Sequence, residues 1–161
     1  MTEIASHHPH CIGCGRENPG SIGLRFVAHG ERIRATCTFD ERHQGAPGFV
    51  HGGSLATAID DTVGTLLVLL RRPAVTARLE VDYRSPAFLG REMALEAWAE
   101  RIEGRKLHLA ATVHDGETLV AEGRALFLAV SLDHFARGGM LPDTLRTHWT
   151  QSHPPQADLP Y

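Results

Sequence analysis

The sequence predicts an α+β protein in which a curved antiparallel sheet of about six strands wraps around one central helix. Three observations predict this arrangement. Two β-like runs precede a single apolar segment that favours helix, and four more follow it. The β-like runs alternate apolar and polar residues, as strands with one buried face do. The helical segment is apolar on every side, so we expect the sheet to surround it.

Turn signals bound the predicted strands. The clearest strand is 75–84, in which apolar and polar residues alternate throughout. Asp115-Gly116 between two alternating runs predicts a hairpin, because both central positions accept a positive φ. His29-Gly30-Glu31 and Glu103-Gly104-Arg105 mark two further turns. The predicted strands are 24–28, 32–39, 75–84, 92–102, 106–114 and 117–130.

The central helix is expected over residues 54–70. It follows a loop rich in Gly and Pro at 44–50, and Arg71-Arg72-Pro73 ends it with two cations and a helix breaker. The segment is shorter than the roughly 20 apolar residues that span a bilayer, and it carries two aspartates. We therefore expect a buried helix rather than a membrane anchor.

Composition indicates one domain with one core. The chain has 161 residues, of which 42% are hydrophobic and 22% charged. The formal net charge is −3 and the basic residues are scattered, which argues against nucleic acid as a partner. We divide the chain into a Cys- and His-containing segment at 1–20, a domain at 21–130 and a tail at 131–161. The Pro-rich tail is expected to be mobile or to form a surface strap.

The N-terminus does not resemble a secretory signal. Residues 1–14 are polar and rich in His, without a basic start followed by an apolar run. Three cysteines, at positions 11, 14 and 37, are too few for a disulfide scaffold. We expect a cytoplasmic protein with no membrane partner.

Two features near the helix are candidates for chemistry. His51-Gly52-Gly53-Ser54 lies where a helix starts, and the unpaired N–H groups there suit an oxygen that becomes negative. The alternative is a Gly-Gly turn with Ser54 as the helix cap. Asp60 lies on an apolar face of the helix, where its charge must be paired or used. The alternative is a buried acid satisfied by backbone donors or an arginine.

Two further residues accompany this acid. Asp61, beside Thr57 and Thr65, has the more polar neighbourhood. Thr76, on the polar side of the next strand, would ordinarily be only a β-former. The sequence contains neither a Gly-x-Ser-x-Gly elbow nor a glycine-rich phosphate loop, which argues against serine hydrolases and nucleotide enzymes.

The N-terminal segment raises the possibility of a metal site. Cys11 and Cys14 have the Cys-x-x-Cys spacing of zinc ligands, and His7, His8 and His10 lie nearby. A lone Cys-x-x-Cys without a second pair is a weak signal. We favour a partly ordered His-rich segment, and we predict no metal and no cofactor.

Four segments together resemble the PaaI-like and THEM4-like branch of the hotdog thioesterases. The resemblance spans about residues 10–130 and implies the hotdog fold and hydrolysis of an acyl-CoA or related acyl thioester. The segment at 43–53 resembles the active-site loop of the family, and the segment at 54–64 resembles its catalytic helix. The other two are an N-terminal Cys-x-x-Cys-Gly and Gly-Leu element at 11–24 and the strand at 75–86.

The resemblance also implies roles for individual residues. Asp60 would act as nucleophile or as general base for water, and the Gly52 N–H would polarise the thioester carbonyl. His51 would help to hold that carbonyl, and Thr76 would position the water or the carboxylate. Substrate-binding positions are expected at Gln44, Val50 and Gly53, although Gln44 lies further before the His-Gly-Gly sequence than its counterpart in many relatives.

In such enzymes the aspartate and the glycine loop usually come from different subunits, so the resemblance implies at least a homodimer, and many relatives are tetramers. A non-catalytic acyl-CoA sensor or carrier on the same fold is the main alternative. A dehydratase would need a different arrangement of Asp and His. The sequence leaves open the acyl group and the choice between CoA and acyl-carrier protein.

Overall fold

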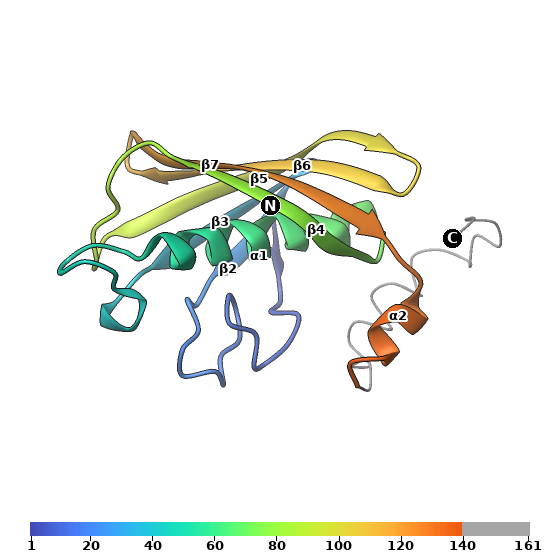
Figure 1. Cartoon of the computed structure of the whole chain (residues 1–161), viewed down its shortest axis with the longest axis horizontal. Helices are drawn as coiled ribbons and strands as arrows, with labels where there is room; N and C mark the ends of the chain where they lie inside the picture. Colours follow the sequence, from blue (N-terminus) through green and yellow to red (C-terminus); the bar gives the residue numbers. More distant parts are fainter. Residues whose placement is uncertain (140–161) are drawn as a thin grey trace.

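The computed structural model describes residues 1–139, in which one antiparallel sheet of seven strands packs against one long helix (Figure 1). The strand order is β1-β2-β3-β5-β6-β7-β4, so β1 and β4 form the two edges. The strands are β1 (Thr2–Ile4), β2 (Arg25–His29), β3 (Arg32–Thr38), β4 (Ala74–Tyr83), β5 (Glu92–Glu103), β6 (Lys106–Asp115) and β7 (Thr118–Ala129).

The six predicted strands are confirmed, with ends that differ by a residue or two. The seventh, β1, pairs antiparallel with β2 through Thr2 opposite Ala28 and Ile4 opposite Phe26. Three residues are too few to show a period, so the sequence pattern did not reveal this strand. The segment from β1 to β2 is therefore joined to the sheet at both ends, and Cys14 within it is buried.

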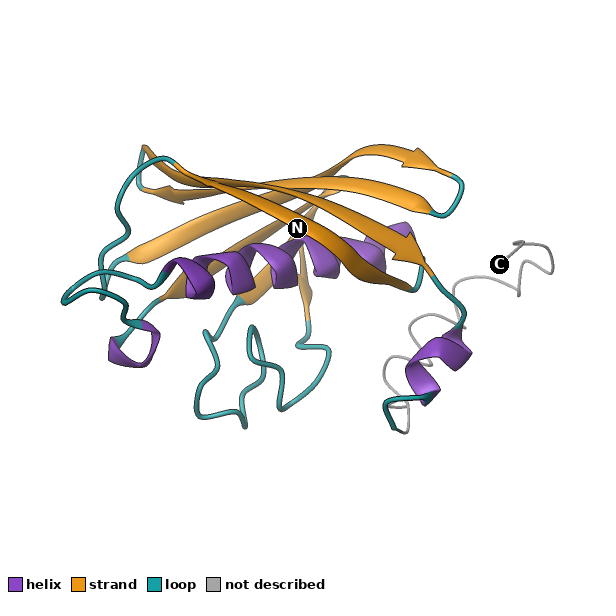
Figure 2. Cartoon of the chain, in the orientation of Figure 1, coloured by secondary structure: helices purple, strands orange, loops and turns teal. Residues whose placement is uncertain are grey.

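Helix α1 (Gly52–Leu70) lies lengthwise against one face of the sheet (Figure 2). Its fully buried face includes Ile59, Val63 and Leu66, which recur at the spacing of one side of a helix. Gly123 on β7 lets the helix approach closely, since a Cβ there would lie 2.4 Å from Cγ2 of Ile59. The single chain does not surround the helix completely, because Asp60, Gly64 and Val68 on another face are only partly buried.

Both ends of α1 have identifiable caps. His51, not Ser54, is the N-cap: its Nδ1 accepts a hydrogen bond of 2.8 Å from the Gly53 N–H. At the other end Arg71 adopts a left-handed conformation with φ of 53°. Its N–H donates to the carbonyl oxygens of Leu67 and Val68 in the last turn of the helix. The predicted stop at Arg71 is confirmed.

The helix has the length and apolarity of a membrane span, as core helices of this size commonly do, and its buried side faces the sheet.

A short helix, α2 (Leu132–Ala136), follows β7, and a single 3-10 turn (Glu41–His43) precedes the loop that leads into α1. Most of the predicted tail at 131–161 lies outside the described residues.

Candidate active site

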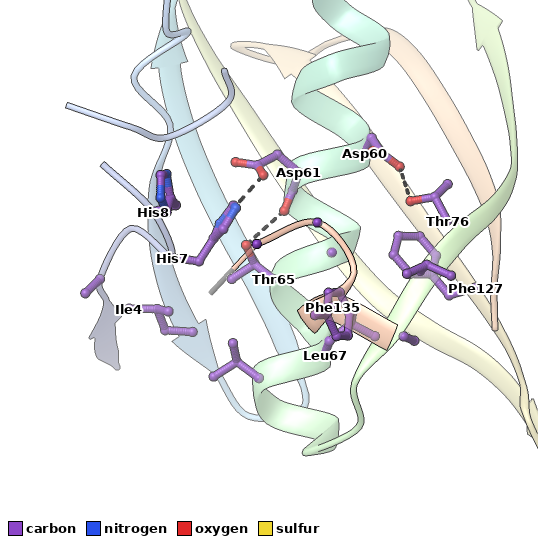
Figure 3. A pocket seen from close by; sticks show the side chains of 17 residues that line it. Ile4, His7, His8, Asp60, Asp61, Thr65, Leu67, Thr76, Phe127 and Phe135 are labelled. Carbon is purple, nitrogen blue, oxygen red and sulfur yellow. Dashed lines mark hydrogen bonds and ion pairs between the residues drawn. The ribbon is translucent and has the colours of Figure 1, made fainter. Parts of the chain in front are cut away.

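The structure brings Asp60 and Thr76 together from α1 and β4. The Thr76 hydroxyl donates a hydrogen bond of 2.9 Å to Asp60 Oδ1 (Figure 3). Partial burial raises the pKa of Asp60, and the hydrogen bond from Thr76 opposes that rise by favouring the ionised form. The result is a carboxylate that is poorly solvated yet held in one orientation, as a nucleophile or general base requires.

A cavity of about 550 Å³ opens beside this pair. Its walls come from α1, β4, β7, α2 and the N-terminal segment, and they are mainly apolar. The volume falls within the range of roughly 300–1,000 Å³ usual for small-ligand sites. Asp60 and Thr76 are thus polar groups at an apolar cavity, whose apolar lining includes Leu67, Val68, Val75, Phe127 and Phe135.

Gly52 is the first residue of α1, so no preceding turn offers a carbonyl to its N–H. The positive end of the helix dipole adds to the attraction for an anionic oxygen there. On β4, Tyr83 donates a hydrogen bond of 2.7 Å to the Gly52 carbonyl and so fixes the helix start to the sheet. Tyr83 was missed by the sequence reasoning, because one exposed aromatic residue in a strand gives no functional signal.

The remaining predicted positions shape the loop before α1. Gln44 Oε1 accepts a hydrogen bond of 2.8 Å from the Gly48 N–H, and Gln44 and Val50 form an isolated β-bridge. Val50 is buried, and its N–H donates to the Ala87 carbonyl at 2.9 Å. Since Gly53 donates its N–H to His51, these three residues hold the loop in shape, and their contact with substrate stays a prediction.

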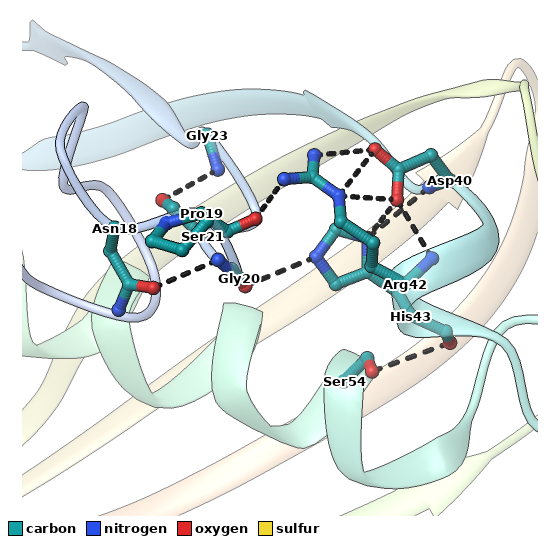
Figure 4. Close-up of polar contacts among 9 residues, drawn as sticks. All are labelled: Asn18, Pro19, Gly20, Ser21, Gly23, Asp40, Arg42, His43 and Ser54. Carbon is teal, nitrogen blue, oxygen red and sulfur yellow. Dashed lines mark hydrogen bonds and ion pairs between the residues drawn. The ribbon is translucent and has the colours of Figure 1, made fainter.

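A polar network fastens this loop to the N-terminal segment (Figure 4). Arg42 binds Asp40 and also donates to the Pro19 carbonyl, and its guanidinium lowers the pKa of Asp40 to about 2. His43 is buried, with its Nε2 3.4 Å from the Gly20 carbonyl oxygen. The Ser54 hydroxyl donates to the His43 carbonyl at 3.4 Å. His43 therefore supports the loop that leads to the helix start.

Asp61 is the more buried of the two acids, and its neighbours include polar side chains, as predicted: Cys11 and His7 from the N-terminal segment. Its side chain is 14% exposed, and burial raises its pKa to about 7. It points away from Asp60 toward the N-terminal segment, where His7 Nδ1 lies 3.9 Å from its Oδ1 (Figure 3). Helical spacing identified Thr65 as a neighbour of Asp61, but it could not identify neighbours from another part of the chain.

Asp60 and Gly52 lie far apart within one chain. At about 1.5 Å of rise per residue, they are separated by roughly 12 Å along the axis of α1. In a thioester under attack, the carbonyl carbon contacts the nucleophile and the carbonyl oxygen contacts the hydrogen-bond donor. These two atoms are only one bond length apart. Asp60 and the Gly52 N–H of the same chain therefore cannot both contact one carbonyl.

Comparisons with known proteins show which chains this one resembles. Acyl-coenzyme A thioesterase THEM4 of Xenopus laevis is 42% identical over 107 residues, which are 64% of this chain and 48% of that protein. The chain thus spans about half the length of that relative. PA0474 of Pseudomonas aeruginosa, a protein named for an expected esterase activity, is 31% identical over 91 residues, with 55% of this chain and 68% of PA0474 covered.

Solved structures show the same fold. The thioesterase superfamily protein RHA08564 is 26% identical with a TM-score of 0.68, over 71% of this chain and 60% of that one. PaaI of Escherichia coli has a TM-score of 0.65 at 16% identity, and the match covers 72% of this chain and 88% of PaaI. The protein smu.793 of Streptococcus mutans, solved with acetyl CoA bound, has a TM-score of 0.64 at 18% identity. The match covers 67% of this chain and 89% of smu.793.

A long helix packed lengthwise against one face of an antiparallel sheet is the hotdog arrangement, and the solved structures above share it. The family model of the Thioesterase superfamily matches residues 47–122, from the loop before α1 into β7. The chain belongs to the thioesterase superfamily, and the predicted resemblance to its PaaI-like and THEM4-like members is confirmed.

Proposed function

We propose that this protein hydrolyses an acyl-CoA to the free acid and CoA, with Asp60 as nucleophile or general base. The observation that carries the proposal is the 2.9 Å hydrogen bond from Thr76 to Asp60 at the apolar cavity. The apolar cavity walls suit an acyl group, and Asp60 lines the same cavity. The name of THEM4 and the acetyl CoA bound to smu.793 support CoA as the thiol carrier.

With Asp60 as base, a water molecule adds its oxygen to the carbonyl carbon while its proton passes to the carboxylate. The C–S bond then breaks, and the departing thiolate takes up a proton to leave as CoA. With Asp60 as nucleophile, the carboxylate attacks the carbonyl carbon and the C–S bond breaks, which gives a mixed anhydride and the CoA thiolate. Water then hydrolyses the anhydride to the free acid and the Asp60 carboxylate. Label in Asp60 after a single turnover in ¹⁸O-labelled water would identify the nucleophilic route with water attacking the Asp60 carbonyl carbon. If water instead attacks the acyl carbon, the label enters the free acid in both routes, and hydroxylamine trapping of the anhydride separates them.

The negative oxygen that develops on the carbonyl needs a donor, and the Gly52 N–H has the geometry for this role. Because roughly 12 Å separates Gly52 from Asp60 of the same chain, we infer that Asp60 acts with Gly52 of the partner subunit. His51 of that same subunit would help to hold the carbonyl. The functional unit is then at least a homodimer.

The first test is thiol release from short, long and aromatic acyl-CoAs by the native protein and by Asp60→Asn. This variant keeps the shape of the side chain and its acceptor for Thr76 while removing the charge. We expect turnover to collapse while acyl-CoA binding persists. Binding without thiol release by the native protein would contradict the proposal and favour an acyl-CoA carrier.

A second test mixes two inactive variants. Asp60→Asn and Gly52→Pro chains are unfolded together and refolded, so that hybrid dimers form. If each site uses Asp60 from one chain and Gly52 from the other, a hybrid has one intact site, and about a quarter of native activity returns in a statistical mixture. If both residues of a site came from one chain, no activity would return.

A further inference from the structure

Four side chains with metal-binding atoms converge beside α1, about 100° around the helix from the Asp60–Thr76 pair. They are His7, Cys11, Cys14 and Asp61, and their ligand atoms all lie within 4.8 Å of one another. Figure 3 shows Asp61 and His7 pointing toward each other on this side, while Asp60 points toward Thr76. We propose that these four residues form a structural zinc site that fastens the N-terminal segment to α1.

The distances between the ligand atoms fit a tetrahedral ion. His7 Nδ1 lies 3.3 Å from Cys14 Sγ and 3.9 Å from Asp61 Oδ1, and Cys11 Sγ lies 3.5 Å from the same Oδ1. With Zn–S bonds near 2.3 Å and Zn–N and Zn–O bonds near 2.1 Å, the edges of a zinc tetrahedron measure about 3.3 to 3.8 Å. Since all four ligand atoms lie within 4.8 Å of one another, closing the site needs a contraction of at most about 1 Å between any two of them.

The donor set selects the kind of metal. Two thiolates and an imidazole favour zinc over magnesium or calcium, which prefer oxygen ligands. Four protein ligands also leave no open position for water, as in structural rather than catalytic zinc sites. The zinc therefore has no part in the proposed thioester hydrolysis.

The loop that carries the two cysteines is built tightly around the cluster. The Gly13 N–H donates to Cys11 Sγ at 3.3 Å, a contact that favours a thiolate, and the Gly15 N–H donates to the Cys11 carbonyl at 2.9 Å. A Cβ on Gly13 would lie 2.3 Å from Asp61 Oδ2, and one on Gly15 would lie 2.4 Å from the Pro9 carbonyl oxygen. Glycine at both positions lets the sulfur atoms approach the carboxylate.

Asp61 supplies a second, independent observation. Its Oδ2 is buried and has no hydrogen-bond partner among the residues that the structure describes. Buried carboxylate oxygens without a partner are costly and rare. A bound cation at the centre of the cluster compensates the charge of this carboxylate and explains why the chain keeps an acid there.

The site also forms part of the substrate cavity wall. His7 and Asp61 line the cavity beside Asp60, together with Ile4 and Ala5 from the same N-terminal segment. Zinc would thus hold one wall of the cavity in place. Cys11 lies 50 residues from Asp61 along the chain, so a metal bond between them closes a long loop and constrains the unfolded state.

The test is the metal content of the untagged, full-length protein, measured by mass spectrometry of the elements and by X-ray absorption at the zinc edge. We expect about one zinc per chain with sulfur and nitrogen or oxygen neighbours, falling below about a tenth in Cys11→Ser and Cys14→Ser. Cys37→Ser, which alters a buried cysteine outside the cluster, and His10→Ala are matched controls that should keep the zinc.

A titration of the native protein keeps the test independent of how the variants fold. After removal of metal by a chelator, Co²⁺ should produce the absorption of a tetrahedral cobalt–thiolate centre, and Zn²⁺ should abolish it. A Cys11–Cys14 disulfide with no bound metal would overturn the proposal. So would zinc retained equally in Cys14→Ser and Cys37→Ser, or iron as the natural occupant.

Discussion

Thr76 Oγ1 donates a hydrogen bond of 2.9 Å to Asp60 Oδ1, which links the edge strand β4 to the middle of α1. This hydrogen bond joins two residues whose individual sequence signals are weak: a threonine in a strand and an acid in a helix. Burial raises the pKa of Asp60, and the hydrogen bond from the Thr76 hydroxyl lowers it by stabilising the ionised carboxylate.

Replacing Thr76 by Val should therefore raise the pKa of Asp60 further. The proposed reaction needs the ionised carboxylate, so the acid limb of the pH profile of kcat/KM should move upward, by about one pH unit for the loss of a hydrogen bond to a charged group. Thr76→Ser, which keeps the hydroxyl, is the control and should titrate like the native protein. An acid limb that stays in place in Thr76→Val would show that Asp60 is not the titrating group.

Gly52→Pro removes the N–H proposed to bind the negative oxygen and leaves the helix start intact. Proline is favoured at the first helical position, and His51 already has the extended backbone (φ −65°, ψ 135°) that a following proline requires. We expect kcat to fall by roughly 10²–10³. Gly52→Ala keeps the N–H and places a Cβ 3.2 Å from the Tyr83 hydroxyl, so it measures the steric effect alone. Equal losses in the two variants would argue against the oxygen-binding role.

Substitutions of His51 should separate its capping role from its proposed contact with substrate. His51→Ala loses the acceptor for the Gly53 N–H and should lower the free energy of unfolding by about 1 kcal/mol, measured in urea. His51→Asn restores a capping oxygen and should unfold like the native protein. If His51 also binds the carbonyl, both variants should lose about tenfold in kcat/KM. Full activity in His51→Asn would leave capping as the only role.

Gly123→Ala should destabilise the fold at the contact between α1 and β7. The added Cβ would lie 2.4 Å from Cγ2 of Ile59, so we expect a loss of about 1–3 kcal/mol in the free energy of unfolding. Ile59→Leu removes that branch methyl at constant volume, and in its background Gly123→Ala should cost clearly less. Additive losses in the double variant would mean that the two residues do not interact.

Much of this architecture could be predicted because the strands and the helix are long and periodic. The strand bearing Thr76 was located from its alternation, and the helix around Asp60 from its continuous apolar run and the Arg71-Arg72-Pro73 that ends it. The roles of Asp60, Thr76 and Gly52 came from the family resemblance, and the hydrogen bond between Asp60 and Thr76 adds geometric support to two of them. The cytoplasmic location stays a prediction.

Other features could not be read from a linear pattern. The neighbourhood of Asp61 is polar, as helical spacing predicted, but Cys11 and His7 come from a distant part of the sequence and could not be identified from that spacing. The lone Cys-x-x-Cys was weak as a metal signal for the same reason, since spacing could not connect it to a fourth ligand. Three-residue strand β1 shows no period at all.

The consecutive positions of Asp60 and Asp61 on α1 limit how this protein can evolve. Inserting or deleting one residue between His51 and Asp60 would rotate both acids by about 100° relative to the helix start. Asp60 would then lose Thr76, and Asp61 would lose the N-terminal cluster, in a single event. Natural variation in chain length should therefore fall in the loop at 44–50 and in the strand turns, while the interval from His51 to Asp60 stays fixed.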